Sequence, residues 1–369
     1  MRRVLFLTPP LQPPWNHASK NLAATLVDAL QHHRPLLASA GRREKDRAEG
    51  RGEKRALPAR LAPKRGALLR AWGRSLREER FDLVHAFFTP SSHNMWLPWL
   101  AREAKKTPFV LTVCSPPQLP RRELSLRLWR KVDRFVVLSR STQDLLRASG
   151  LESERVVHIP PALSLRSLPD SRTGAALRAE LGFAATPLLV YPGDLEYGGG
   201  AELAIRALRA LARSEAQLVM LCRQKSARAT KAQAELVALS ERLGLRGRVH
   251  WWGESAARLR VLACADLVLM PNPSSFAKMD YPLVVLEAMA MARPVLVAQK
   301  TPVAELAEGG GVLAVDAQTD SLAAQVEHLL GDEAARRALG ERARKQVARD
   351  FDPLAIARRY EEEVYRALY

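Results

Sequence analysis

The sequence predicts an α/β protein built from two doubly wound domains. Short, uniformly apolar runs recur along the chain with helical segments between them, which is typical of buried parallel strands joined by helices. The alternation weakens to Ser, Pro, Asp and Arg over residues 162–186 and then resumes. With 369 residues the chain is long enough for two domains of ordinary size, each with its own core.

The first series of elements begins with an apolar strand at 4–7, a Pro-rich loop and a helix at 19–30. Ser139 is a natural N-cap for a helix at 141–150. Residues 41–66 are charged and lack apolar periodicity, which predicts a mobile basic loop. Further strands are expected at 81–86, 108–113, 134–138 and 156–159.

The second series repeats the same alternation. Strands are expected at 188–191, 217–221, 248–252 and 265–270, and helices at 201–212, 231–243 and 255–263, with one short helix at 173–181 before them. We therefore assign an N-terminal domain to 1–170, a linker to 171–186 and a C-terminal domain to 187–352. The final segment, 353–369, is amphipathic.

Composition and charge limit the compartment and the partners. The net charge is +18, with basic clusters at 41–66 and 121–134, and such a surplus suits nucleic acid, an anionic membrane surface or anionic substrates. No aromatic-basic nucleic-acid motif is visible, so nucleic acid is not the expected partner. The three cysteines show no metal-ligand spacing, and the N-terminal apolar run is too short for a signal peptide or a membrane span. We expect a cytoplasmic protein, peripheral to the inner face of the cell membrane if it docks there.

The stretch 270–306 carries the clearest chemistry. A buried strand ends at Met270, a polar loop follows, and Pro282 suits the first turn of the next helix because its missing N–H costs nothing there. A strand, a loop and a helix N-terminus aimed at that loop form a place to hold a phosphate. The backbone amides near Leu283 and Val284 would receive it.

This stretch resembles the donor-binding core of retaining, nucleotide-sugar-dependent glycosyltransferases of the GT-B fold, family 4. That family carries two glutamates separated by seven residues, the second followed by Ala-Met-Ala and then by Pro-Val, and residues 287–290 and 293–295 match this second half. The first glutamate is replaced by Met279. Lys278 and Asp280 stand beside it, and we expect these two residues to have the catalytic roles. The resemblance also implies two Rossmann-like domains facing across a cleft, with the final segment crossing back to the first.

The resemblance further implies a donor site in the C-terminal domain. Glu287 would accept hydrogen bonds from ribose hydroxyls, and Gly193 lies in a Gly-rich loop that permits close approach to a ligand. Relatives place an Arg and a Lys in this loop to neutralise the diphosphate, whereas here Asp194 and glycines stand there. The cations would then come from elsewhere, and the candidates are Arg223, Lys225 and Lys278. A plain surface role for them stays open.

Other polar residues follow strand ends of the N-terminal half and would bind the acceptor: His17, Ser19, Lys20 and His93, with His85 and Asn94 nearby. His85 ends a buried strand and could equally be a core histidine. Trp251 and Trp252 could contact a nucleobase, but a tryptophan pair in the core is the favoured interpretation.

The function implied is transfer of a sugar from a nucleoside-diphosphate sugar to a glycan or lipid-linked acceptor, with retention, without a metal and with no further cofactor. A degenerate member that binds nucleotide sugar or glycan without turnover is the alternative, because Met279 replaces a glutamate that acts on the donor sugar in relatives.

Overall fold

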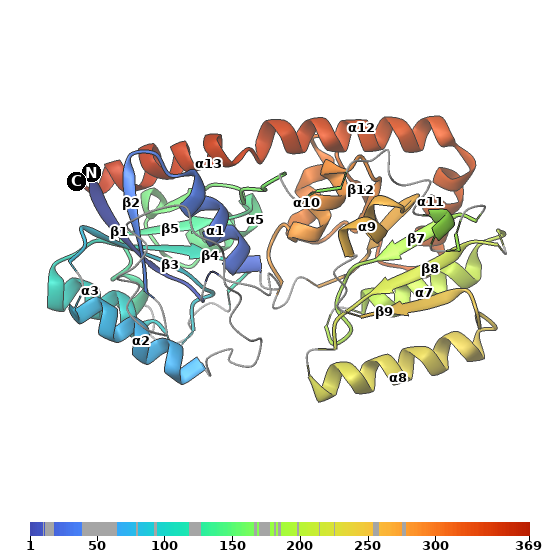
Figure 1. Ribbon diagram of the computed structural model, residues 1–369, viewed down its shortest axis with the longest axis horizontal. Helices are drawn as coiled ribbons and strands as arrows, with labels where there is room; N and C mark the ends of the chain where they lie inside the picture. The colour runs from blue at the N-terminus through green and yellow to red at the C-terminus, as the bar shows by residue number, and fades with distance from the viewer. Residues whose placement is uncertain are drawn as a thin grey trace. The chain divides into compact units, whose positions relative to one another are not determined.

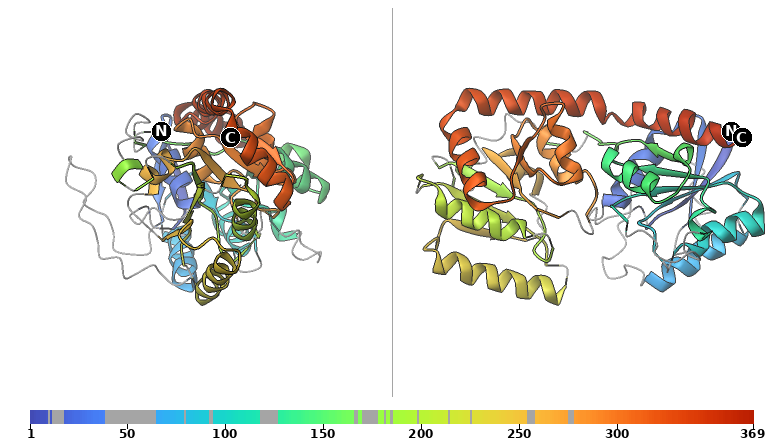
Figure 2. Two further views of the ribbon diagram at one scale, coloured as in Figure 1. Left: turned by 90° about the vertical axis from the view of Figure 1, so that its right-hand side faces the viewer. Right: turned by 180° about the vertical axis from the view of Figure 1, so that it is seen from behind.

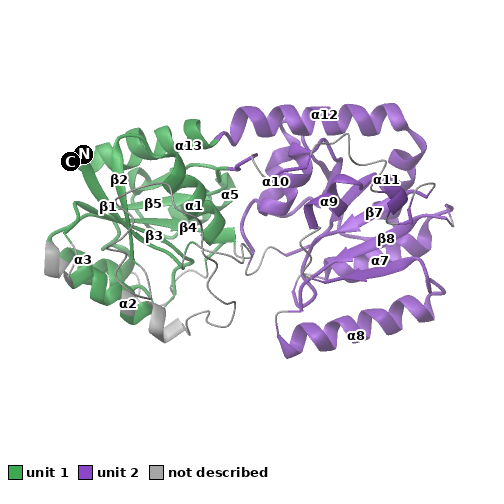
Figure 3. Cartoon of the chain, in the orientation of Figure 1, with its two compact units in different colours: residues 1–162, 353–369 green, residues 163–352 purple. Residues whose placement is uncertain are grey.

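The protein was analysed as a computed structural model (Figure 1), which describes residues 1–9, 11, 18–38, 65–78, 80–91, 94–117, 127–165, 168–169, 178–180, 182–183, 186–197, 199–213, 215–224, 226–253, 258–274 and 278–369. The chain divides into two compact units. Unit 1 consists of residues 1–162 together with 353–369, and unit 2 of residues 163–352 (Figure 3). The expected linker at 171–186 falls within unit 2, partly outside the described residues.

Unit 1 contains a six-stranded parallel sheet in the order β2-β1-β3-β4-β5-β6. Each strand except the two at the edges, β2 and β6, has buried residues along most of its length, which explains why these strands read as apolar runs. The strand order reverses at β1, because β2 lies on one side of β1 and β3 to β6 follow one another on the other side. The strands are β1 (Arg2–Leu7), β2 (His33–Leu37), β3 (Leu83–Phe87), β4 (Phe109–Val113), β5 (Arg134–Val137) and β6 (Val156–His158).

Helices cover both faces of this sheet (Figures 1 and 2). Trp72 and Leu97, from α2 and α3, join one core cluster with alternate strand residues, while α1 and the C-terminal helices lie on the opposite face. Ser139 caps α5, accepting a hydrogen bond from the N–H of Thr142 at 3.1 Å, as predicted. The helices are α1 (Ala18–Ala29), α2 (Arg65–Glu78), α3 (Trp96–Lys105), α5 (Arg140–Ala148) and α13 (Pro353–Arg359), with 3-10 turns at Ser153–Arg155 and Arg366–Leu368 and a π-helical segment at Tyr360–Tyr365.

Unit 2 contains a second six-stranded parallel sheet, in the order β12-β11-β10-β7-β8-β9. The strands are β7 (Leu188–Tyr191), β8 (Gln217–Leu221), β9 (Val249–Trp252), β10 (Leu267–Met270), β11 (Val295–Ala298) and β12 (Leu313–Val315). The helices are α7 (Gly200–Ala210), α8 (Ala227–Arg242), α9 (Arg258–Ala263), α10 (Leu283–Ala290), α11 (Thr319–Gly331) and α12 (Glu333–Asp350), with a 3-10 segment at Pro302–Ala307. Two parallel α/β sheets confirm the predicted fold class.

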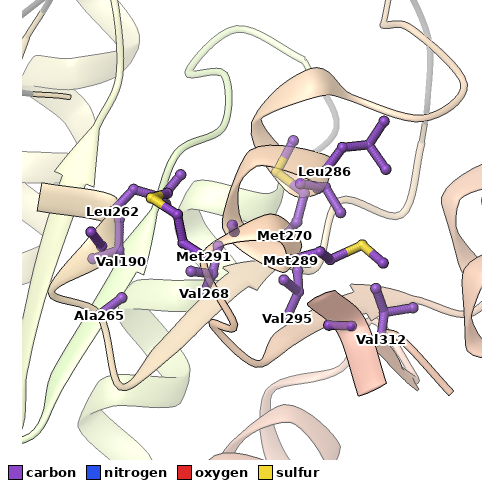
Figure 4. Packing of buried hydrophobic residues seen from close by; sticks show 14 of the residues in the cluster. Val190, Leu262, Ala265, Val268, Met270, Leu286, Met289, Met291, Val295 and Val312 are labelled. Atoms are coloured by element: carbon purple, nitrogen blue, oxygen red, sulfur yellow. The ribbon is translucent and has the colours of Figure 1, made fainter. Parts of the chain in front are cut away.

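The core of unit 2 is densest around β10 and the helix that follows it. Val268, Leu286 and Val295 are fully buried, and Met289 extends from α10 between them and Val312 (Figure 4). Both faces of β10 are covered, in agreement with a run of apolar residues that does not alternate. This packing fixes α10 rigidly against the sheet, and α10 carries Glu287.

Element boundaries differ from the prediction mainly where caps decide them. Helix α8 begins at Ala227 instead of 231, because the side chain of Ser226 accepts a hydrogen bond from the N–H of Ala229 at 3.1 Å. Helix α9 is described from Arg258 to Ala263; residues 254–257 lie outside the described part of the chain, so the expected start at 255 stays a prediction. Most of the expected basic loop, residues 41–64, also lies outside it.

His85 is a core histidine of unit 1. Its ring is fully buried, with Nδ1 2.6 Å from the hydroxyl of Tyr365 and Nε2 2.7 Å from the hydroxyl of Thr112. The hydroxyl of Tyr360 lies 3.2 Å from that of Thr112, so the C-terminal segment is joined to the middle of the sheet through one polar network. Burial lowers the pKa of His85 well below its ordinary value and raises the pKa values of both tyrosines.

The lowered pKa of His85 predicts acid sensitivity. Below pH 6.5 the unfolded chain takes up a proton that the folded protein excludes, so the free energy of unfolding is expected to fall as the pH falls, at up to about 1.4 kcal/mol per pH unit. Denaturant titrations between pH 7.5 and 5 measure this slope. His85→Gln is expected to have a shallower slope than the parent, whatever its stability at neutral pH. Equal slopes would contradict the assignment.

Candidate functional site

The topological switch point of unit 2 lies between β7 and β10. Strand β7 pairs with β8 on one side and with β10 on the other. After β7 the chain continues toward β8 and β9, whereas after β10 it continues toward β11 and β12 on the other side of the sheet. Ligands of doubly wound folds bind at such a point, beyond the carboxyl ends of the strands. Three loops meet this edge: 192–199, 222–226 and 271–282.

The loop after β7 is shaped by two glycines and one aspartate. A Cβ at Gly193 would lie 2.2 Å from Cζ of Tyr191, so only glycine lets the backbone pass over that ring. Asp194 then forms a turn, its Oδ1 accepting hydrogen bonds from the N–H groups of Glu196 at 2.7 Å and Tyr197 at 3.1 Å. Glycine at 193 is therefore already required by Tyr191, apart from any ligand.

Lys278 pairs with Asp194. Its ammonium donates to Oδ2 of Asp194, while Oδ1 of the same carboxylate holds the turn. The Lys278 ammonium also lies 5.9 Å from the centre of the Tyr197 ring. Both side chains are mostly buried, at 22% and 10% exposure. The family resemblance implies an arginine at position 194. In this chain Asp194 stands there and pairs with Lys278 from the loop after β10.

A buried polar pair joins the same two loops beneath the ion pair. Asn272 donates from Nδ2 to the Tyr191 hydroxyl at 3.1 Å, and that hydroxyl donates to the backbone carbonyl of Asp194 at 3.0 Å. A Cβ at Gly200 would lie 2.5 Å from Oδ1 of Asn272, so the start of α7 approaches this amide closely. Burial raises the pKa of Tyr191 and, together with nearby Asp194, that of Cys222, so the phenol and the thiol stay protonated.

The loop after β8 approaches from the other side. The Ser226 hydroxyl donates to Glu196 at 2.8 Å, and the guanidinium of Arg228 lies 5.1 Å from the centre of the Tyr197 ring. Arg223 is half-buried at the end of β8. Lys225 lies outside the described residues. The loops after β7, β8 and β10 therefore carry both cations and carboxylates at one sheet edge.

Helix α10 begins at this edge. Pro282 is its N-cap residue, and the N–H of Val285 makes the first helical bond, to the carbonyl of Pro282 at 2.8 Å. The N–H groups of Leu283 and Val284 precede that bond, as donors in the first turn of a helix do. Next to them Met279 and Asp280 are buried, at 6% and 1% exposure.

Glu287 lies in the second turn of α10 and forms a two-pronged ion pair with Arg258, the first residue of α9. Nη1 of Arg258 donates to Oε2 at 2.6 Å, and Nη2 donates to Oε1 at 3.0 Å. The sequence interpretation missed this arginine. No local pattern in the sequence pointed to it, because its partner lies 29 positions away.

Trp251 and Trp252 are half-buried and pack on opposite faces of the sheet, one against each core cluster of unit 2. The core interpretation of this pair therefore accounts for their position, because alternate residues of a strand face opposite sides.

The expected acceptor residues are only partly described. Ser19 and Lys20 lie in the first turn of α1, after β1, and Lys20 is 6% exposed; burial lowers its pKa. Asn94 instead holds its own turn, accepting from the N–H of Ser91 at 2.9 Å and donating to the carbonyl of Thr89 at 3.0 Å. His17 and His93 lie outside the described residues.

Within the part of the chain that the structure describes, no helix is long and apolar enough to cross a bilayer. Among the same residues, no group of three or more His, Cys, Asp or Glu side chains could hold a metal ion.

The chain has two parallel α/β sheets, and a helix N-terminus and a carboxylate lie at the switch point of the second sheet. This is the arrangement of GT-B glycosyltransferases. Family models agree. The model described as glycosyl transferases group 1 matches residues 186–332, and the model described as Glycosyltransferase Family 4 matches residues 19–166. The chain belongs to this retaining family and is a nucleotide-sugar-dependent glycosyltransferase.

Two curated relatives cover most of the chain. The D-inositol 3-phosphate glycosyltransferase of Kineococcus radiotolerans is 28% identical over 79% of this chain and 73% of its own length. The alpha-D-kanosaminyltransferase of Streptomyces kanamyceticus is 27% identical over 73% of each protein. Their different activities leave the acceptor of this chain undetermined.

Solved structures support the fold. The HepE protein of Anabaena, crystallised with UDP and glucose, matches with a TM-score of 0.75 over 99% of this chain and 100% of its own, at 17% identity. A sucrose-phosphate synthase from Thermosynechococcus elongatus matches with a TM-score of 0.76 over 100% of this chain and 99% of its own, at 18% identity.

Proposed function

We propose that this glycosyltransferase binds the nucleoside diphosphate of its donor at the switch point of unit 2 and transfers the sugar to a glycan or lipid-linked acceptor without a metal. The observation that carries the proposal is Glu287, a carboxylate fixed in the second turn of α10. The N-terminus of the same helix points its N–H groups at the loops of this edge. Ribose hydroxyls on the carboxylate and a phosphate at the helix N-terminus place one nucleotide along α10.

The diphosphate needs positive charge as the glycosidic bond to it breaks, because the leaving group gains charge in the transition state. Lys278 is the cation best placed among the described residues, because it lies in the loop that leads into α10 and pairs with Asp194 of the loop after β7. Arg223 follows β8 at the same edge, and Lys225 follows it in sequence. The negative charge of Asp194 disfavours the negatively charged leaving group. Lys278 must therefore either leave Asp194 or donate hydrogen bonds to Asp194 and the phosphate at the same time.

Asp280 and Lys278 flank Met279, and we propose that they act on the donor sugar in place of the missing glutamate. The residues Ser19, Lys20, His17 and His93 remain the proposed acceptor contacts in unit 1. Three of the relatives matched by this chain act on sugars or small polar acceptors, as their names state, which fits a polyol or glycan hydroxyl as the nucleophile.

Release of nucleoside diphosphate tests turnover. The full chain is incubated with UDP-, GDP-, ADP-, TDP- and CDP-linked sugars, together with polyol, glycan and lipid-extract acceptors. We expect acceptor-stimulated release from one donor class. A protein that binds a donor yet never releases diphosphate with any acceptor would favour the alternative, a degenerate member in which Met279 has abolished catalysis.

We also propose that the basic side of unit 1 docks on an anionic membrane, which would bring a lipid-linked acceptor to the enzyme. The exposed arginines Arg70, Arg74 and Arg77 form one stripe on α2, at spacings of four and three residues. Helix α3, which packs on α2, exposes Trp99 at 48%. An arginine stripe on one helix and an exposed tryptophan on the helix packed against it suit the interface of an anionic bilayer.

Vesicle co-sedimentation checks this docking. Each basic residue contributes roughly 1 kcal/mol near an anionic surface, so binding to phosphatidylglycerol vesicles is expected to be reversible and sensitive to salt. Arg70→Gln, Arg74→Gln and Arg77→Gln together are expected to lower retention, whereas the matched change of Arg206 and Arg209 on α7 of unit 2 should not. Equal retention on neutral phosphatidylcholine vesicles would contradict the proposal.

A further inference from the structure

The carboxylate of Glu287 is already engaged on both oxygens by one side chain. Arg258 grips it with two parallel N–H donors, at 2.6 and 3.0 Å, in the planar geometry that only arginine provides. Glu287 is 12% exposed and Arg258 37% exposed, so the pair lies at the rim of the site with its carboxylate turned inward.

The interaction with Glu287 stabilises the charged form of Arg258. Burial acts to lower the pKa of Arg258, but the hydrogen bonds and the charge of Glu287 outweigh this, and the pKa of Arg258 is raised. Glu287 is therefore the main polar partner of Arg258 among the described residues.

A carboxylate has about four lone pairs on its two oxygens, and a two-pronged arginine uses two of them. One lone pair is left on each oxygen, and these two point away from each other. A ribose hydroxyl can therefore donate to the carboxylate while the arginine stays bound. In that arrangement the arginine holds the two oxygens in one orientation.

We infer that Arg258 is a positioning residue for the nucleotide: it holds the Glu287 carboxylate in one orientation, in which an oxygen of the carboxylate receives a ribose hydroxyl. This inference rests on the proposed donor site. It assigns to Arg258 a role in distinguishing ribose from deoxyribose, exerted through Glu287 and not by contact with the phosphates.

The test compares ribonucleoside and 2′-deoxyribonucleoside diphosphates. The parent is titrated calorimetrically with UDP, GDP, ADP and CDP, and the tightest is paired with its 2′-deoxy form. Arg258→Ala is expected to weaken ribonucleotide binding roughly tenfold, the scale of a hydrogen bond to a charged group, and to reduce the preference for ribose. Arg260→Ala is the matched control, because Arg260 lies on the same helix and pairs with exposed Glu180 at 3.2 Å.

The preference for ribose separates positioning from a merely structural role. Arg258→Lys keeps the positive charge and loses the planar fork, so it is expected to show intermediate ribonucleotide affinity and a reduced preference for ribose. A variant that only loosened α9 would weaken ribonucleotide and deoxyribonucleotide binding equally at every pH from 6 to 8.

Three results would overturn the inference while leaving the donor site intact: unchanged ribose preference in Arg258→Ala, tighter binding by that variant, or an equal loss in Arg260→Ala. Tighter binding would mean that Arg258 blocks the carboxylate instead of presenting it. A parent that binds none of the nucleoside diphosphates would overturn the proposed donor site itself, and the inference with it.

Discussion

Lys278→Ala is expected to lower the rate constant for turnover of bound donor by roughly tenfold or more, about 1.4 kcal/mol or above. The loss has two sources. The variant removes a cation from the diphosphate and leaves the Asp194 carboxylate, now without Lys278, facing the leaving group. Turnover should suffer more than ground-state binding, because the leaving group gains charge in the transition state. Single-turnover kinetics at saturating donor measure the effect.

A cycle with Asp194→Asn separates the two sources. Asparagine keeps the oxygen that accepts from the N–H groups of Glu196 and Tyr197, but removes the negative charge. Asp194→Asn alone is expected to bind nucleoside diphosphate more tightly than the parent. In the double variant, Asp194→Asn should recover part of the loss caused by Lys278→Ala.

Lys231→Ala is the matched control, because Lys231 is an exposed lysine of α8 that pairs with Glu235 at 3.8 Å. If Lys278→Ala turns over donor at the parent rate, the cations that serve the diphosphate are others, and Arg223 and Lys225 become the candidates to replace next.

Glu287→Gln is expected to weaken nucleoside diphosphate binding by about 1.5–3 kcal/mol, the scale of a hydrogen bond to a charged group. The amide keeps the shape of the side chain but offers one acceptor oxygen, where the carboxylate serves both the guanidinium of Arg258 and the ribose. The fold should be unaffected, because Arg258 is 37% exposed and can be rehydrated. Calorimetry gives the affinity and thermal unfolding gives the stability.

The control is Glu202→Gln, which changes an exposed glutamate of α7 that pairs with Arg206 at 2.8 Å. It is expected to bind nucleotide like the parent. An unchanged affinity in Glu287→Gln, with the same enthalpy of binding, would remove Glu287 from the donor site.

The sequence predicted the strands best, because parallel strands buried on both faces leave uninterrupted apolar runs such as 188–191 and 267–270. It predicted less well where one side chain decides a boundary, as Ser226 does for α8. The sequence indicated an amphipathic C-terminal segment, but it did not predict the partners of its tyrosines, His85 and Thr112, which come from strands far away in sequence.

The candidate site shows the same division. Local sequence pointed to α10 and Glu287 within one stretch, and placed Pro282 in the first turn, whereas the structure has it one position earlier, as the N-cap. The pairings of Lys278 with Asp194 and of Arg258 with Glu287 join residues 84 and 29 positions apart, and no local pattern predicts them. The family resemblance implies an arginine at the position of Asp194, which left open which cation serves the diphosphate. The fold shows that Lys278 lies against Asp194.

Calorimetric titration of the parent with a panel of nucleoside diphosphates and with the corresponding nucleosides tests the central claim most directly. The account predicts that one diphosphate binds, that its nucleoside binds more weakly because the N-terminus of α10 and Lys278 have lost their anion, and that Glu287→Gln weakens both. A parent that binds no nucleoside diphosphate and no nucleotide sugar, while remaining folded, would contradict it.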